Sequence, residues 1–480
     1  MKKNLLAIAC LLFSLSVIAQ EKKETLTLDR NDLILNVMYF PQNGLILKKG
    51  KDYMNSKALD WEMFFYNPDL TLKYKASIEK TQINKGFRNY FVTSPDAKYI
   101  YHIEGKGYNT TFGASSQFIT QFDETGAKKT YELENLKDLG NREVMFADSQ
   151  YMYYIATVNV KDEVTKKKKQ KTILIKLKST DFSRQDVEVK LPGLKDEDYS
   201  SDWFYCGNGE NKIYFMSKTV KDDGTFIYDL ITMDRDGKIL SNISMDAKLS
   251  GVFPRPTYNE KYYFWADFEN PDFYTSTYTS SYSNAVGSYT STDVSVNHTL
   301  SAFGDIVIDE KSNSIYIYGL TGPAPYKRLG PLNKGYFVQK YDLAGKEIWK
   351  KQYDFGQEIL DNEYVRLHST PYGRSLKFKI NPDNTVKLQL LAKDMVYTFM
   401  FDGTGKQTST YSNEFKNRSD ASFSMAYNPA VGSEAVKYLI SKDPKLTKAF
   451  KYNMYNFDKN DVVLENDTKT KTVNLLLFKK

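Results

Sequence analysis

The chain has 480 residues, with 66 Lys and Arg against 59 Asp and Glu, and a formal net charge of +7. Without Lys2 and Lys3, which lie in a predicted signal peptide, 64 basic and 59 acidic residues leave +5, too little to indicate a nucleic-acid partner. Aromatic residues make up 15% of the chain and few stretches have helical periodicity, so the composition favours strands.

The amino terminus has the features of a secretion signal. A positive start precedes an apolar run over residues 5–15, which predicts a signal peptide over residues 1–19, cleaved near Ala19. A lipoprotein signal at Cys10 is a weaker alternative, because the apolar run continues past it. No later stretch has the ~18 apolar residues that span a bilayer. We therefore expect no transmembrane segment and a mature domain, residues 20–480, in the periplasm or outside the cell.

Once the signal peptide is removed, Cys206 is the remaining cysteine, and an internal disulfide is excluded. An oxidising compartment permits disulfides without requiring them in a chain of this size. We expect Cys206 to be a small buried hydrophobe within a strand.

A hairpin pattern recurs along the chain, in which an aromatic-rich strand, a turn of the type Asp-x-x-Gly-Lys and a second strand follow one another. The positions that precede the turns are residues 66, 122, 177, 233, 341, 401 and 457. Their spacing is about 55 residues, except for one interval near twice that length. A fixed period on this scale with all-β units predicts a β-propeller.

A second series of strands with alternating side chains has the same period. Its members are residues 44–50, 98–105, 150–158, 212–220, 261–269, 314–322, 385–393 and 435–442. The member at 261–269 falls in the long interval of the turn series. The two series together predict a single propeller of about eight antiparallel blades, with seven as the alternative. Each blade has four strands, which we call A to D in chain order.

The two ends of the chain each hold a spare strand, at residues 25–28 and 472–478. If one completes the sheet of the other, the ring closes and no edge is left to pair with another chain. In such a meander the A–B and C–D turns lie at one end of the strands. The long B–C connections lie at the other end, where we place any binding site.

The segment 272–299 is an insertion of Ser, Thr and Tyr with almost no charge. Such a segment is compatible with an adaptable surface for a sugar or a peptide, as in the tyrosine-serine loops of antibodies. The alternative is a degenerate blade edge with a polar loop that binds nothing. The candidate residues of this fifth unit are Trp265, Tyr274, Tyr278, Tyr282 and Tyr289.

Two further groups are candidate polar contacts. Lys327 and Arg328 lie in a proline-stiffened loop that suits an anion, although an ordered connector is the alternative. Arg366, His368 and Arg374 form the one cluster with histidine that merits a test as a polar site; an ordinary strand and loop is the alternative.

Signals of catalysis are weak. The chain has 3 histidines and no HExxH, P-loop or Gly-x-Ser-x-Gly motif. His102 alternates within a strand, so we interpret it as structural. The DRDG sequence at 234–237 lacks the remaining ligands of a calcium loop. We expect no catalytic residue, cofactor or metal, while a carboxylate pair that meets only in the folded chain remains an alternative.

The blade pattern resembles the β-propeller repeats of secreted bacterial proteins over nearly all of the mature chain. It lacks the WD dipeptide of WD40 repeats and the double glycine of kelch repeats. The resemblance therefore implies a fold and no site residues.

The favoured function is a secreted, non-enzymatic binding or scaffold protein of the bacterial cell envelope, which contacts a protein, peptide or glycan through its B–C loops. The first alternative is a propeller hydrolase or lyase that acts on polysaccharide or peptide, with a carboxylate pair or His368 near the central channel. The second alternative is a purely structural envelope component.

Overall fold

The computed structural model describes most of the mature chain. The described residues are 20–29, 32–40, 43–51, 59–81, 89–94, 98–106, 116–134, 139–161, 164, 166, 168–192, 203–209, 211–220, 226–247, 278–284, 287–293, 299–300, 306–321, 335–362, 365, 374–381, 383–392, 394–415, 432–443, 452–467 and 469–480.

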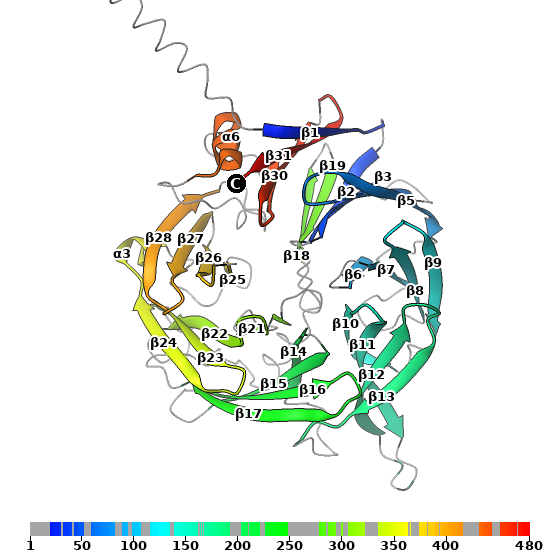
Figure 1. Cartoon of the computed structure of the whole chain (residues 1–480), viewed down its shortest axis with the longest axis vertical. Coiled ribbons are helices and arrows are strands. Elements are labelled where there is room, and N and C mark those ends of the chain that lie inside the picture. Colours follow the sequence, from blue (N-terminus) through cyan, green and yellow to red (C-terminus); the bar gives the residue numbers. More distant parts are fainter. Residues whose placement is uncertain are drawn as a thin grey trace, which may run out of the picture.

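The described strands form seven blades around a common axis, and the first strand of each blade lies innermost (Figure 1). Blades 1 to 3 are β2 (Asp32–Phe40), β3 (Gly44–Lys51), β4 (Leu59–Tyr66) and β5 (Leu72–Thr81); β6 (Asn89–Thr93), β7 (Tyr99–Lys106), β8 (Ser116–Asp123) and β9 (Lys128–Glu134); and β10 (Leu139–Ala147), β11 (Tyr151–Lys161), β12 (Lys168–Lys178) and β13 (Arg184–Val189).

The remaining blades follow the same order. Blades 4 to 6 are β14 (Trp203–Gly209), β15 (Lys212–Val220), β16 (Phe226–Asp234) and β17 (Ile239–Ala247); β21 (Ile306–Asp309), β22 (Ser314–Thr321), β23 (Gly335–Asp342) and β24 (Glu347–Asp354), with the short β20 (Thr299–Leu300) beside β21; and β25 (Arg374–Ile380), β26 (Val386–Ala392), β27 (Met395–Phe401) and β28 (Gln407–Glu414).

Blade 7 is built from both ends of the chain. Its inner strands are β29 (Tyr452–Asn456), β30 (Asn460–Asp467) and β31 (Thr472–Lys479), and β1 (Gln20–Thr27) pairs antiparallel with β31 as the fourth strand. The Thr25 hydroxyl donates to Asn474 Oδ1 at 2.9 Å, and the Leu28 amide donates to the Lys471 carbonyl at 2.8 Å. The predicted pairing of the two terminal strands is confirmed.

The seven-bladed alternative is therefore the observed architecture, and the eighth member of the expected strand series is a helix. Residues 435–442 belong to α6 (Glu434–Lys442) instead of a strand. Ser433 caps its amino terminus by accepting a hydrogen bond from the Val436 amide, with Glu434 in the first turn and Lys442 in the last. Ala435, Val436 and Leu439 are buried, a spacing that suits one helical face as well as a short strand.

The turn pattern at 457–466 also differs from the prediction. It joins β29 to β30, the A–B turn of blade 7, whereas the third and fourth strands of that blade are β31 and β1. The expected strand at 261–269 lies outside the described residues. What the structure describes in the long interval is a hairpin, β18 (Tyr278–Asn284) and β19 (Gly287–Asp293), which joins blade 1.

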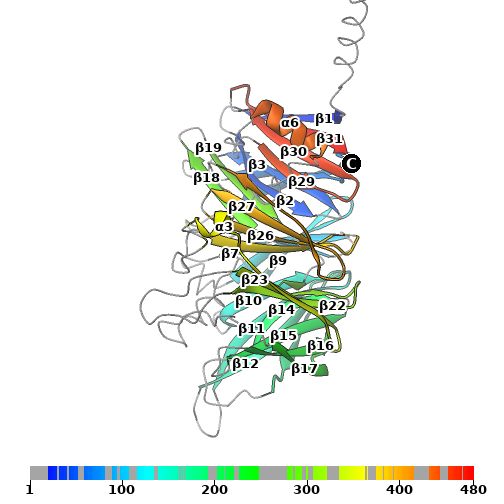
Figure 2. The ribbon, with the colours of Figure 1, turned by 90° about the vertical axis from the view of Figure 1, so that its left-hand side faces the viewer.

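The core consists of seams between neighbouring blades, because each sheet is apolar on both faces. Alternate residues of one strand face opposite seams: Tyr214 and Met216 pack on blade 5, while Ile213 and Phe215 pack on blade 3. Cys206 is fully buried in the seam between blades 4 and 5, as expected. The seams stack side by side around the ring (Figures 1 and 2).

The C–D turns share one hydrogen-bonding pattern. In blade 6, Asp402 Oδ1 accepts from the Thr404 amide at 2.9 Å and the Lys406 amide at 3.0 Å, and Gly405 has φ +82°. The same pattern recurs at Asp123, Asp234 and Asp342. The hydrogen bonds, that of the Thr404 hydroxyl first, lower the pKa of Asp402. In these turns the Asp therefore accepts the backbone hydrogen bonds and the Gly supplies the positive φ.

Each glycine of these turns packs against the outer strand of the preceding blade. A Cβ at Gly405 would lie 2.7 Å from the Trp349 ring, and one at Gly126 would lie 2.7 Å from the Tyr74 ring. Trp349 Nε1 also donates to the Gly403 carbonyl at 3.1 Å. The repeated turn therefore joins the blades as well as reversing the chain.

We expect Gly405→Ala to lower the free energy of unfolding by about 1–3 kcal/mol, because alanine would combine a left-handed φ with a clash at Trp349. Gly403→Ala is the matched control, since the nearest atom to its Cβ is 4.0 Å away. Denaturant unfolding of both variants measures the difference. Equal stability would contradict this role of the turn.

Candidate functional site

Most of the candidate residues fall where side chains are not described. Trp265, Tyr274, Lys327, Arg328, Arg366 and His368 lie outside the described residues. The backbone is described at the remaining positions: Tyr278 and Tyr282 on β18, Tyr289 on β19 and Arg374 at the start of β25. Arg374 pairs with Ala392 in blade 6, in a different sheet from the tyrosines.

The β18–β19 hairpin pairs with a blade that is distant from it in the sequence. It lies between blades 4 and 5 in the sequence, yet β19 pairs in parallel with β2, the innermost strand of blade 1. Ser291 is opposite Val37 and Asp293 is opposite Tyr39. Figures 1 and 2 place the hairpin beside β2, on the axis side of that strand. The insertion therefore extends one blade to a six-stranded sheet.

The register of the hairpin places its three tyrosines on one face. Tyr282 is directly opposite Tyr289, and Tyr278 is opposite Asp293, the one charged residue of the two strands. These positions have the same parity, so they belong to one face of the pleated hairpin. Because β19 runs parallel to β2, its start at Gly287 lies toward the end of the ring where the B–C and D–A connections run.

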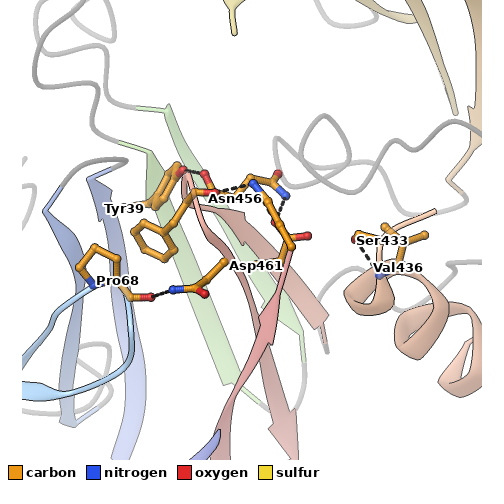
Figure 3. Close-up of polar contacts among 9 residues, drawn as sticks. Tyr39, Pro68, Ser433, Val436, Asn456 and Asp461 are labelled. Atoms are coloured by element: carbon orange, nitrogen blue, oxygen red, sulfur yellow. Dashed lines mark hydrogen bonds and ion pairs between the residues drawn. The ribbon is translucent and has the colours of Figure 1, made fainter. Parts of the chain in front are cut away.

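The strand that carries the hairpin is fixed to the closing blade. The Tyr39 hydroxyl donates to the Asn456 carbonyl, and its ring lies 5.5 Å from that of Tyr455 (Figure 3). Asn456 Nδ2 donates to Asp461 Oδ1 at 2.8 Å, and Asn460 Nδ2 donates to the Pro68 carbonyl at 3.4 Å. The hairpin is therefore attached to the seam where the ring closes.

A second polar feature lies within the seam between blades 1 and 2. His102 on β7 is fully buried and Lys48 on β3 is 3% exposed. Burial, and then the charge of Lys48, lowers the pKa of His102 well below its usual range. His102 sits among packed side chains, which agrees with its interpretation as a structural residue.

Within the described part of the chain, no group of three or more His, Cys, Asp and Glu side chains is placed to hold a metal ion. None of the described helices is long and apolar enough to cross a membrane.

No protein-family model and no curated protein matches the sequence. Solved structures with a similar chain path include the β-propeller domain of the Trilobed protease from Pyrococcus furiosus, with 13% identity, TM-score 0.37 and coverage of 94% of this chain and 95% of that one. A Synechocystis apocarotenoid oxygenase mutant has 10% identity, TM-score 0.32 and coverage of 79% and 71%. A subtype N11 neuraminidase-like protein has 8% identity, TM-score 0.32 and coverage of 80% and 86%.

These similarities are too low to carry any activity over to this chain. The chain is a seven-bladed β-propeller in its described part.

His102 should make stability fall as the pH drops below about 6.5. Its folded pKa is depressed, so the unfolded chain binds more protons in this range and gains stability relative to the folded chain. We expect His102→Gln to flatten the decline in unfolding free energy between about pH 6.5 and 5, by up to about 1.4 kcal/mol per pH unit. Denaturant titrations across this range test it, and a slope unchanged from wild type contradicts it.

Proposed function

We propose that this chain is a secreted, non-enzymatic binding propeller of the bacterial cell envelope, and that the β18–β19 hairpin is its main contact with a protein, peptide or glycan. The placement of the hairpin carries the proposal. It is not one of the four strands of any blade, yet it is held at the axis side of β2, across the ring from the blades that flank it in sequence.

The chemistry of the hairpin suits recognition more than core packing. Residues 278–293 consist mainly of Ser, Thr and Tyr. Tyrosine offers a large rigid ring with a hydroxyl, and serine offers adaptable hydrogen bonding, which together suit a sugar or a peptide. β18 is the end strand of the six-stranded sheet, and in the described residues no strand pairs with its outer edge. Such an edge suits an extended peptide, which would add as a further strand.

The ring supplies a rigid support for this surface. Val37 of β2 is fully buried, and Tyr39 is bonded to blade 7. A contact surface on a rigid support loses little conformational entropy on binding. His368, one of the groups that the enzymatic alternative would use, lies outside the described residues.

Deletion of residues 273–292 tests the proposal, because it removes β18 and nearly all of β19 while every blade keeps its four strands. We expect an unchanged circular dichroism spectrum and the loss of a partner that wild type retains from envelope extract or on a glycan array. An unfolded deletion variant would assign the segment to the core. A folded variant that retains every partner would contradict the proposed role of the hairpin.

A milder variant distinguishes the contribution of the tyrosine rings to binding from that of the hairpin backbone. Tyr278→Ser/Tyr282→Ser/Tyr289→Ser is expected to weaken binding at least about tenfold, since each ring at a well-packed contact contributes about 1 kcal/mol or more. Thr279→Ser/Thr292→Ser is the matched control, because this cross-strand pair lies at positions of the opposite parity, on the other face of the same hairpin. If both variants bind the partner with equal affinity, the tyrosines are not part of the contact surface.

A further inference from the structure

Blade 3 has a hairpin that extends beyond its own sheet. In the other six blades, the fourth strand pairs with the third strand as far as the first residue of that third strand. In blade 3 the fourth strand, β13, ends its pairing at Val189, opposite Thr172. Among the described residues, the first four residues of β12 therefore have no strand on that side. On the other side, β10 stops pairing with β11 at Val158.

The part that extends is a two-stranded ribbon. It consists of residues 159–161 of β11, which pair antiparallel with residues 168–170 of β12. At ~3.3 Å per residue, these three pairs add ~10 Å beyond the four-stranded sheet. Figure 1 places the paired ends of β11 and β12 at the outer edge of the ring. Because an isolated two-stranded ribbon is marginally stable at best, its own pairing adds little to the stability of the fold.

Positive charge is concentrated on this ribbon and its turn. Residues 161–171 include six lysines and two carboxylates, a net charge of +4 out of +7 for the whole chain, and the two carboxylates lie outside the described residues. Lys161 is directly opposite Lys168. Like charges at opposite positions weaken a strand pair, so the ribbon does not gain stability from them. Lys161 and Lys166 are exposed, and Lys171 is paired with Glu188 of β13 at 3.1 Å.

An apolar side chain lies in the turn between these lysines. Val164 is 91% exposed, whereas the next most exposed of the large apolar side chains that the structure describes, Ile348, is 52% exposed. An exposed apolar residue flanked by lysines suits the boundary between the headgroups and acyl chains of a bilayer, where the ammonium groups stay in the polar layer. A soluble polyanion would contact the lysines and leave Val164 in water. The combination therefore favours a lipid surface.

We propose that the β11–β12 ribbon binds the surface of a bilayer rich in anionic phospholipid. The lysines at positions 161, 166, 168 and 169 pair with headgroup phosphates, and Val164 enters the boundary of the acyl chains. Each lysine near such a surface strengthens binding by about fivefold, and salt screens this part of the attraction. The ribbon is separate from the β18–β19 hairpin, so this surface does not depend on the role of that hairpin.

Flotation of the mature chain with lipid vesicles tests the proposal. We expect wild type to bind phosphatidylcholine vesicles that contain about 30% phosphatidylglycerol, and not pure phosphatidylcholine vesicles. Lys161→Gln/Lys166→Gln/Lys168→Gln/Lys169→Gln should weaken this binding at least about tenfold. The matched control removes the same charge from exposed positions in turns at the opposite end of the blades, and it should bind as wild type does. It is Lys238→Gln/Lys346→Gln/Lys406→Gln/Lys459→Gln.

The apolar contact has a readout of its own. Val164→Trp should shift tryptophan emission to shorter wavelength with the anionic vesicles and not with phosphatidylcholine vesicles. Wild type, with its 4 native tryptophans, is the reference for this measurement. An unshifted emission contradicts entry of Val164 into the boundary of the acyl chains.

Dextran sulfate distinguishes a bilayer from a soluble polyanion. The proposal is wrong if wild type binds dextran sulfate and not the anionic vesicles, if it binds neither, or if the two fourfold variants lose vesicle binding equally. It is also wrong if the ribbon variant retains vesicle binding and instead self-associates, because the lysines would then serve only to protect the free strand edges of the ribbon.

Discussion

Burial of both faces of every sheet is the constraint on which this structure depends. No blade can cover its own apolar surface, so each is stable only between two neighbours. The seam between blades 5 and 6 illustrates this: Tyr318 of one blade stacks on Phe378 of the next, 4.7 Å apart. A series of such seams leaves one apolar face exposed at each end unless the first and last blades meet, so ring closure completes the core.

The seams share a plan but differ in their polar contacts. Lys176 Nζ of blade 3 bonds to Asp236 of blade 4 at 2.8 Å, and the Tyr214 hydroxyl of blade 4 donates to Glu310 of blade 5. Buried Arg235 lies over the Phe146 ring at 4.5 Å, across the seam between blades 3 and 4. Because unpaired polar groups are costly in such places, each contact favours one neighbour over another. The order of the blades therefore depends on residues that differ from one blade to the next, and not only on the residues of the shared repeat.

The sequence alone was enough to predict the turns, the strand alternation and the pairing of the two chain ends, since these depend on local chemistry at a fixed period. It misled at residues 435–442, where the apolar spacing fits a helix and a strand equally well. It held no signal for the parallel pairing of Ser291 with Val37, because a contact across the ring has no local signature.

Closure by β1 also sets an order of events for a newly made chain. Thr25 meets Asn474 across a sequence separation of 449 residues, so the first strand to be synthesised has to wait for nearly the last. Until then β1 is an unpaired strand and the outward edge of the growing ring is open. A chain that stops short of residue 472 retains most of its blades but cannot join its ends. Without β31, the edge of β1 that pairs with it in the ring would be exposed, and exposed strand edges favour pairing with other chains.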